Sequence, residues 1–407
     1  MNDSGSATAR LDAAAAGNTQ ACVSSAALEP SVARLHLHPV GCTRPFDLLV
    51  PEQRGLTLVG REEELAALTD WLDSPGDMSV RCIVGRPGTG KTRLALELCE
   101  RAEAQGWLAG FLAPEAITGA ARASRVLAIV DRAGGWVSAA RLNGLAAHSL
   151  PPGGKTRVLL LDRTVDHSWC ADLTQMGVTV DPPEPVRLAG LRSAADRDHL
   201  LRQALGHAAR LSGDPVPLPP SGAALDTGEP LHLVMAALLA PQHGVEALLA
   251  EPPARLAERL AARELARLER CAWELRLTPA MVTHIAAIIT LQDGCRVDGL
   301  RALIEEECEH LQISLHEGAG HLADCMTDIL AGADGVRLPA LAPDLIGEAA
   351  VIRMLVRHAP DAQTGIVQRA LRRDPFPVAE MLRRIQRDHA GDDPPRLAFE
   401  WSQHAIG

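Results

Sequence analysis

The segment from Gly85 to Thr92, with the sequence GRPGTGKT, combines residue types that can bind a phosphate chain. Gly85, Gly88 and Gly90 allow the backbone to curl so that several N–H groups point at one anion. Lys91 is placed to bridge the β- and γ-phosphates, and Thr92 to ligate Mg²⁺. The spacing therefore predicts a site for a purine nucleoside triphosphate, with ATP or ADP and Mg²⁺ as the cofactors.

Lys91 stands out because the chain of 407 residues contains two lysines and uses arginine at every other basic position apart from histidines. A compact ammonium group is needed at this point of the loop, and a guanidinium is not equivalent to it. The adjacent Thr89 and Arg93 are further expected nucleotide contacts. The second lysine, Lys155, follows two glycines in a similar run, but it precedes a strand and no helix follows. We therefore expect a loop without a ligand around Lys155.

A phosphate loop needs a strand directly before it, which sets its direction, and a helix directly after it. The helix directs the positive end of its dipole at the anion. Alternating apolar residues predict strands over Met78–Val84, Trp107–Leu112, Arg125–Val130, Arg157–Leu161 and Val186–Leu188, and helices over Glu62–Leu72, Thr92–Glu103 and Val137–Ala147. This alternation predicts an α/β fold with a doubly wound parallel sheet, the core of a P-loop NTPase.

Two of the predicted strands end in Asp-Arg, and either aspartate could hold the Mg²⁺ shell. Asp131 ends the third strand counted from the phosphate loop, and Asp162 ends the fourth. In P-loop ATPases with an additional strand, the acidic strand is the third, and the fourth carries a polar residue that senses the γ-phosphate. We therefore predict Asp131 as the Mg²⁺ and catalytic acid and Arg163 as the γ-phosphate sensor. The swapped assignment, with Asp162 as the acid, stays open.

Neither aspartate is followed by the acid that commonly polarises the attacking water. Arg132 follows Asp131, and Arg163 follows Asp162. Slow ATP hydrolysis is therefore expected, and nucleotide binding is the firmer prediction.

The composition predicts a cytoplasmic protein without a membrane anchor. The N-terminus lacks the basic start and apolar stretch of a signal peptide, and the longest apolar run, Leu231–Ala240, is shorter than the ~20 residues of a membrane span. A net charge of −11 argues against nucleic acid as a partner, since phosphate affinity comes mostly from Lys and Arg. Nine scattered cysteines without a CxxC pair indicate neither a disulfide framework nor a zinc site.

The order of several segments resembles that in STAND ATPases, the signal-transduction relatives of AAA+ proteins that include NB-ARC and bacterial NLR-like proteins. These segments are Val59-Gly60-Arg61-Glu62, the phosphate loop, Leu161-Asp162-Arg163 and Gly228-Glu229-Pro230-Leu231. The runs Lys91–Ala95, Gly106-Trp107, Ala109-Gly110 and Pro343–Glu348 are similar to a bacterial branch of these proteins. The resemblance covers roughly residues 50 to 350.

By this resemblance, Val59 and Gly60 would line the adenine pocket, and Pro230 would close over it from a helical lid. STAND proteins hold ADP in an inactive state and oligomerise when ATP replaces it. The resemblance thus implies a signalling switch in bacterial defence or regulation, which forms a homo-oligomer. No effector fits into the first 50 residues and no long sensor array follows Glu348, so we expect a separate effector or sensor protein. The alternative is an AAA+-type ATPase that remodels or loads a partner, for example on DNA.

The chain divides into five expected parts. They are a flexible N-terminal segment (1–49), a P-loop nucleotide-binding domain (50–191), a helical lid (192–250), a winged-helix-like helical domain (251–350) and C-terminal helices (351–407). The first part is rich in small and polar residues without periodicity, and everything beyond Pro252 is predicted to be helical.

Overall fold

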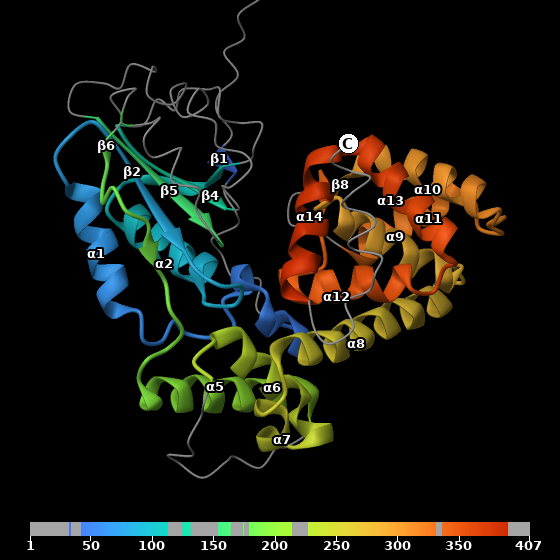
Figure 1. Ribbon diagram of the computed structural model, residues 1–407, viewed down its shortest axis with the longest axis horizontal. Helices are drawn as coiled ribbons and strands as arrows, with labels where there is room; N and C mark the ends of the chain where they lie inside the picture. The colour runs from blue at the N-terminus through green and yellow to red at the C-terminus, as the bar shows by residue number, and fades with distance from the viewer. Residues whose placement is uncertain are drawn as a thin grey trace, which may run out of the picture.

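A parallel β-sheet with flanking helices precedes a long helical region (Figure 1). The computed structural model describes residues 32–33, 42–112, 124–131, 154–163, 174, 179–213, 227–330 and 336–389. The sheet strands are β1 (Val32–Ala33), β2 (Met78–Val84), β3 (Leu108–Leu112), β4 (Arg125–Asp131), β5 (Lys155–Asp162), β6 (Thr179–Val180) and β7 (Val186–Arg187). The expected α/β fold, a parallel-sheet core followed by helices, is confirmed.

The strands follow the order β3-β4-β5-β2, with β6 and β7 both paired along the free edge of β2. All of these pairs are parallel, while β1 adds an antiparallel edge beside β3. After β2 the chain crosses to β3, runs back through β4 and β5 to pair beside β2, and then continues on the other side of β2. In open α/β sheets, ligands bind beyond the carboxyl ends of the strands at the point where the strand order reverses.

Helices α1 (Glu62–Asp73) and α2 (Lys91–Ala104) cover one face of the sheet. Alternate residues of the strands, including Ile83, Leu127 and Leu159, pack against them in one hydrophobic core. A strand places successive side chains on opposite faces, so this alternation follows from the pleat. The cores are built mostly from aliphatic side chains, which matches a sequence with four phenylalanines and no tyrosine.

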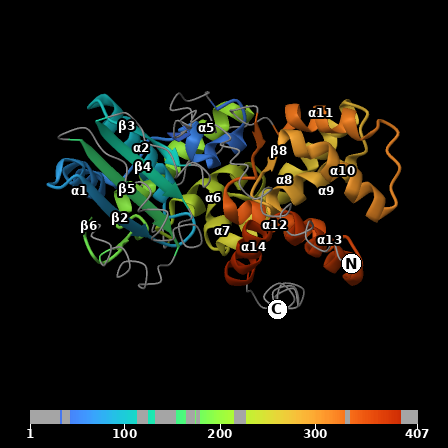
Figure 2. The ribbon, with the colours of Figure 1, turned by 90° about the horizontal axis from the view of Figure 1, so that it is seen from above.

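The helical region begins after β7 and packs around a second core. Its helices are α5 (Ala194–Ser212), α6 (Pro230–His243), α7 (Val245–Leu249), α8 (Pro253–Glu274), α9 (Pro279–Leu291), α10 (Val297–Leu311), α11 (Ala319–Ile329), α12 (Asp344–Leu355), α13 (Pro360–Arg373) and α14 (Pro375–Asp388). Figure 2 shows α5, α6 and α7 between the sheet and the later helices. In the described part of the chain, no helix is long and apolar enough to cross a membrane.

One feature of this region differs from the sequence prediction. The segment beyond Pro252 is not entirely helical, because β8 (Cys295–Arg296) and β9 (Arg337–Leu338) form an antiparallel pair that encloses α10 and α11. Such two-residue strands leave no periodic signal in a sequence.

The segment expected to be flexible, 1–49, contains structure at its end. The 3₁₀ helices η1 (Pro45–Leu49) and η2 (Pro51–Gln53) follow each other directly. Leu48 and Leu49 are buried in the core of the helical region, so flexibility is the wrong prediction for these residues. Their burial removes enough apolar surface from water to order a short segment.

The five predicted strands are confirmed, and their ends agree with the observed ends within two residues. The last of them, Val186–Leu188, is shortened to β7. The helix predicted over Glu62–Leu72 is confirmed as α1. The helix predicted over Val137–Ala147 lies outside the described residues.

Candidate functional site

The phosphate loop joins β2 to α2 at the carboxyl edge of the sheet. Gly88 and Gly90 have φ angles of 79° and 94°, in the left-handed region that glycine adopts without strain. At Gly88 a β-carbon would also lie 2.7 Å from the Cβ of Leu231. At Gly85 it would lie 2.6 Å from the carbonyl oxygen of Leu188. Backbone conformation therefore requires glycine at positions 88 and 90, and close packing requires it at positions 85 and 88.

Arg61, which lies in the segment Val59–Glu62, holds the phosphate loop in place through hydrogen bonds to backbone carbonyl groups. Its buried guanidinium donates hydrogen bonds to the carbonyl oxygens of Thr89, at 2.9 Å, and Ala189, at 2.6 Å. Its other nitrogen pairs with Glu64 at 3.1 Å. Because one side chain binds both the loop and the segment after β7, Arg61 holds the loop in position.

Lys91 is the first residue of α2, and its Nζ donates hydrogen bonds to the carbonyl oxygens of Gly85 and Arg86, at 2.7 and 3.1 Å. Burial lowers the pKa of Lys91, Asp131 partly offsets that effect, and the positive charge of Arg163 adds to it. A phosphate group beside Lys91 would supply the negative charge that favours the ammonium form.

Thr92 and Asp131 meet across the end of the sheet. The Oγ1 atom of Thr92 donates a hydrogen bond of 2.9 Å to Oδ2 of Asp131. Asp162, at the end of the neighbouring β5, accepts a hydrogen bond of 2.6 Å from the backbone N–H of Arg163. A threonine hydroxyl paired with a carboxylate oxygen suits Mg²⁺, which prefers oxygen ligands and retains several waters. This geometry favours Asp131 as the Mg²⁺ acid, and the assignment remains a prediction.

The residues that could hold the cofactor surround a single cavity of about 300 Å³. This volume lies at the lower end of the range for small-molecule sites, about 300 to 1,000 Å³. Of the predicted site residues, the lining includes Val59, Gly88, Thr89, Gly90, Lys91, Thr92, Arg93, Asp131, Arg163 and Pro230. Gly60 and Gly85 lie beside the cavity without lining it. A β-carbon at Gly60 would lie 2.7 Å from a carboxylate oxygen of Asp196 on α5, and the expected contact of Gly60 with adenine stays a prediction.

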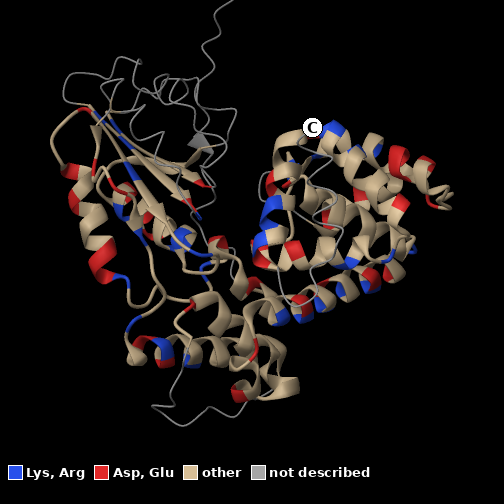
Figure 3. Cartoon of the chain, viewed as in Figure 1, with Lys and Arg blue, Asp and Glu red and all other residues tan. Residues whose placement is uncertain are grey.

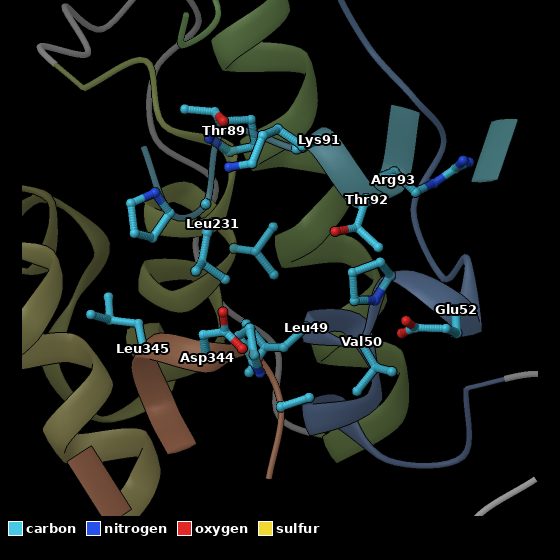
Figure 4. A pocket seen from close by; sticks show the side chains of 18 of the residues that line it. Leu49, Val50, Glu52, Thr89, Lys91, Thr92, Arg93, Leu231, Asp344 and Leu345 are labelled. Carbon is cyan, nitrogen blue, oxygen red and sulfur yellow. The ribbon is translucent and has the colours of Figure 1, made fainter. Parts of the chain in front are cut away.

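Part of the cavity lining is apolar. Val59, Leu49 and Val50 line it from the N-terminal side, and Pro230 and Leu231 of α6 line it from the lid. Figure 4 shows several of these side chains with Lys91 and Thr92 on the opposite wall. The backbone N–H of Leu231 donates to the carbonyl oxygen of Gly88 at 3.1 Å, so the lid contacts the phosphate loop directly.

Arg163 has a different environment from the one expected. Its side chain is 11% exposed, and it donates hydrogen bonds to Asp344 at 3.1 Å and Glu348 at 3.0 Å, both on α12. It also pairs with Asp388 of α14. Burial works against the charged guanidinium, but Glu348, Asp344 and Asp388 outweigh it and raise the pKa of Arg163. The predicted phosphate sensor is therefore joined to the C-terminal helices.

Sequence reasoning missed the cavity residues supplied by those helices. Asp344, Phe376 and Arg384 all line the cavity, and Figure 4 shows Asp344 of α12 across the cavity from Thr92. Asp344 lies in the Pro343–Glu348 segment noted for its resemblance, so that segment was the available signal. Arg384 lies in an ordinary amphipathic helix, and nothing in its local pattern marks it.

Comparison with protein families returns one model, described as the AAA ATPase domain, which matches residues 57–151. This range contains the phosphate loop, α2 and Asp131. Residues 57–151 thus match an AAA ATPase domain, a class that uses nucleotide and Mg²⁺. None of the curated proteins compared with this sequence matches it.

The solved structures similar to this chain include several DNA-replication proteins. The ORC1 protein of Aeropyrum pernix in complex with DNA has 13% identity, a TM-score of 0.29, and a match covering 77% of this chain and 97% of that one. DnaA from Aquifex aeolicus with AMPPCP has 12% identity and a TM-score of 0.32, over 86% of this chain and 95% of that one. NtrX from Brucella abortus with ADP has 16% identity and a TM-score of 0.32, over 56% and 69%. Similarities this weak carry no functional argument.

Proposed function

We propose that this chain is an ATP- and ADP-binding switch in which the bound nucleotide controls the contact between the AAA ATPase domain and the C-terminal helices. The observation that carries this proposal is the composition of the cavity wall. Lys91 and Thr92 come from the phosphate loop, Pro230 from the lid, and Asp344 and Arg384 from the C-terminal helices. A nucleotide there would contact all three parts, so its chemical state can bias their arrangement.

Each end of the cavity fits one part of a nucleotide. The phosphate loop and the start of α2 offer backbone N–H groups and Lys91 to the phosphates. Thr92 and Asp131 would hold Mg²⁺, which bridges phosphate oxygens. Val59 and Pro230 would pack on the base from its two sides. These roles are proposals supported by the geometry described above.

Slow hydrolysis belongs to the same proposal. A switch must keep its nucleotide long enough for the conformational state to be read. Asp131 is followed by Arg132, where an acid would polarise the attacking water, and Arg132 lies outside the described residues. The resemblance to STAND ATPases supports assembly into a homo-oligomer with ATP and signalling through a separate effector or sensor protein, in bacterial defence or regulation.

The two lysines of the chain provide a matched test of nucleotide binding. Lys155 donates hydrogen bonds to the carbonyl oxygens of Asp73 and Ser74 at the opposite end of β5 from Asp162, and it does not line the cavity. A ligand at roughly a thousand times its Kd stabilises a fold by about 4 kcal/mol. We expect Mg²⁺–ATP and Mg²⁺–ADP to raise the Tm of the wild type and of Lys155→Ala, and not that of Lys91→Ala. An unchanged shift in Lys91→Ala would show that the loop is not the binding site.

The second candidate is an AAA+-type ATPase that remodels or loads a partner, for example on DNA. The match to the AAA ATPase domain bears more directly on this candidate than on the STAND resemblance. Arg residues alternate with Glu residues along α8 (Figure 3). Arg259 and Arg267 there pair with Glu251 and Glu264, at 2.8 and 2.6 Å.

These ion pairs reduce the positive charge that α8 could offer to a phosphate backbone. Retention of the protein on duplex DNA at physiological salt would support the second candidate. Failure to bind DNA with either nucleotide would leave the switch as the better account.

A further inference from the structure

The contact between Arg163 and the C-terminal helices is a compact salt-bridge cluster, named here the Arg163 cluster. It consists of Arg163, Asp344, Glu348 and Asp388. Between 181 and 225 residues of sequence separate Arg163 from its three partners. The cluster therefore joins the end of β5 to α12 and α14.

Arg163 supplies the hydrogen bond to the buried Glu348, although Arg384 also pairs with Asp344 at 3.6 Å and Arg387 with Asp388 at 3.5 Å. Glu348 is fully buried and accepts a hydrogen bond of 3.0 Å from Arg163. Arg384 and His389 approach Glu348 at 3.5 and 3.4 Å, but these contacts lack hydrogen-bond geometry. Removing one partner from a buried ion pair is costly because it leaves a buried charge uncompensated. If Arg163 turned to another anion, the buried carboxylate would favour separation of α12 from the sheet.

A terminal phosphate would compete for the same arginine. Arg163 and Asp344 line the cavity together with Lys91 and Thr92. Both also affect the pKa of Lys91: beyond the larger effect of burial, Arg163 lowers it and Asp344 raises it. A γ-phosphate bound by Lys91 would therefore lie in the field of the cluster. It would offer oxygens to the guanidinium and repel the carboxylates, whereas a diphosphate ends one phosphate earlier.

We propose that Asp344, Glu348 and Asp388 determine the discrimination between nucleoside di- and triphosphate at this site. They hold Arg163 in a contact that is compatible with a diphosphate. A triphosphate engages Arg163 only by displacing the carboxylates, which releases α12 and α14 from the end of the sheet. This inference rests on the proposed function, because it requires that nucleotide bind at the phosphate loop.

The test removes one carboxylate at a time. Asp388→Asn and Asp344→Asn keep the size of each side chain and weaken its hold on Arg163, while Asp361→Asn on α13 changes an exposed carboxylate as a control. Titration calorimetry with Mg²⁺–ADP and with a non-hydrolysable ATP analogue gives the ratio of the two Kd values. We expect the ratio Kd(analogue)/Kd(ADP) to fall about tenfold in the first two variants, as one charge-assisted hydrogen bond of about 1.4 kcal/mol would give. It should stay unchanged in Asp361→Asn.

The outcomes separate this inference from the proposed function. An unchanged ratio in both cluster variants, with both nucleotides still binding in a manner that requires Lys91, would overturn the role of the carboxylates and leave the switch intact. Binding of neither nucleotide by the wild type would overturn the proposed function and this inference together. Asp344 is one-third exposed, so Asp344→Asn keeps the test open should Asp388→Asn fold poorly.

Discussion

Thr92 and Asp131 are 39 residues apart in sequence, and a hydrogen bond joins their side chains. The pairing follows from the sheet: β5 lies between β2 and β4, so the ends of all three strands meet beside the phosphate loop. Asp162 lies at the same edge, one strand nearer to the loop. At the scale of single residues, the central question is which aspartate serves the metal ion.

Replacing each aspartate by asparagine answers this question. We expect Asp131→Asn to weaken the Mg²⁺-dependent part of ATP affinity about 10- to 100-fold, the usual effect of altering a group that supports a metal site. Asp162→Asn should retain most of it. Calorimetric titrations of ATP with Mg²⁺ and with EDTA measure this difference. The reverse pattern would establish the swapped assignment.

Several residues of the site could be predicted from local sequence, and others could not. The spacing of the phosphate loop marks Lys91 and Thr92, because backbone geometry demands glycine at fixed positions around them. Gly60 was assigned to the nucleotide by resemblance, and its closeness to Asp196 on α5, more than 130 residues later, could not be predicted from its own segment. Arg384 reaches the cavity through tertiary packing, which leaves no trace in its own segment.

At the scale of elements, the central strands of the sheet could be predicted from the sequence because they are long and continuously apolar. The strands β4 and β5 are buried on both faces along most of their length, as parallel strands in an α/β fold are. The two-residue strands β6, β8 and β9 were missed because they are too short to show alternation. The spatial order of the strands, β3-β4-β5-β2, was not predicted, because it depends on pairing between segments that are far apart in the sequence.

A buried charge network holds the C-terminal helices together. Glu307 of α10 is fully buried and pairs with Arg369 and Arg373 of α13, and it lies 3.1 Å from Nε2 of His284 on α9. Burial opposes its charged form, but the hydrogen bonds from His284, Arg369 and Arg373 lower the pKa of Glu307 below its ordinary value of 4.5. One carboxylate thus connects three helices.

Glu307→Gln should lower the free energy of unfolding by about 3 to 5 kcal/mol, because it leaves two arginines without their buried partner. Glu305→Gln is the control on the same helix: its partner Arg301 is exposed, and such surface pairs contribute about 1 kcal/mol or less. Urea unfolding of the three proteins measures the differences. A similar small loss in both variants would contradict a central role for Glu307.

The pH dependence of the same variant has a defined sign. The pKa of Glu307 is lower in the folded state, so the unfolded chain takes up the proton first as the pH falls. The stabilisation is complete well above pH 4.5 and decreases as the pH falls below that value. The gap in unfolding free energy between the wild type and Glu307→Gln should therefore narrow under acid conditions.

At the scale of the whole molecule, the cavity lies where the sheet, the lid and the C-terminal helices converge (Figures 1 and 2). A nucleotide that contacts three parts can bias their arrangement without rapid turnover. ATP-dependent assembly combined with slow hydrolysis is what the STAND resemblance adds to this account. Fast turnover by a protein that remains monomeric with ATP would contradict it, and sedimentation together with a phosphate-release assay measures both quantities.

The central claim is that the nucleotide controls the contact between the AAA ATPase domain and the C-terminal helices. Small-angle X-ray scattering coupled to size-exclusion chromatography, which separates the monomer from any oligomer, tests it directly, with saturating Mg²⁺–ADP and then with a non-hydrolysable ATP analogue. We predict a larger radius of gyration with the analogue, because α12 and α14 leave the end of the sheet, and no such difference in Lys91→Ala. Identical scattering curves from the wild type, with calorimetry showing both nucleotides bound, would contradict the account.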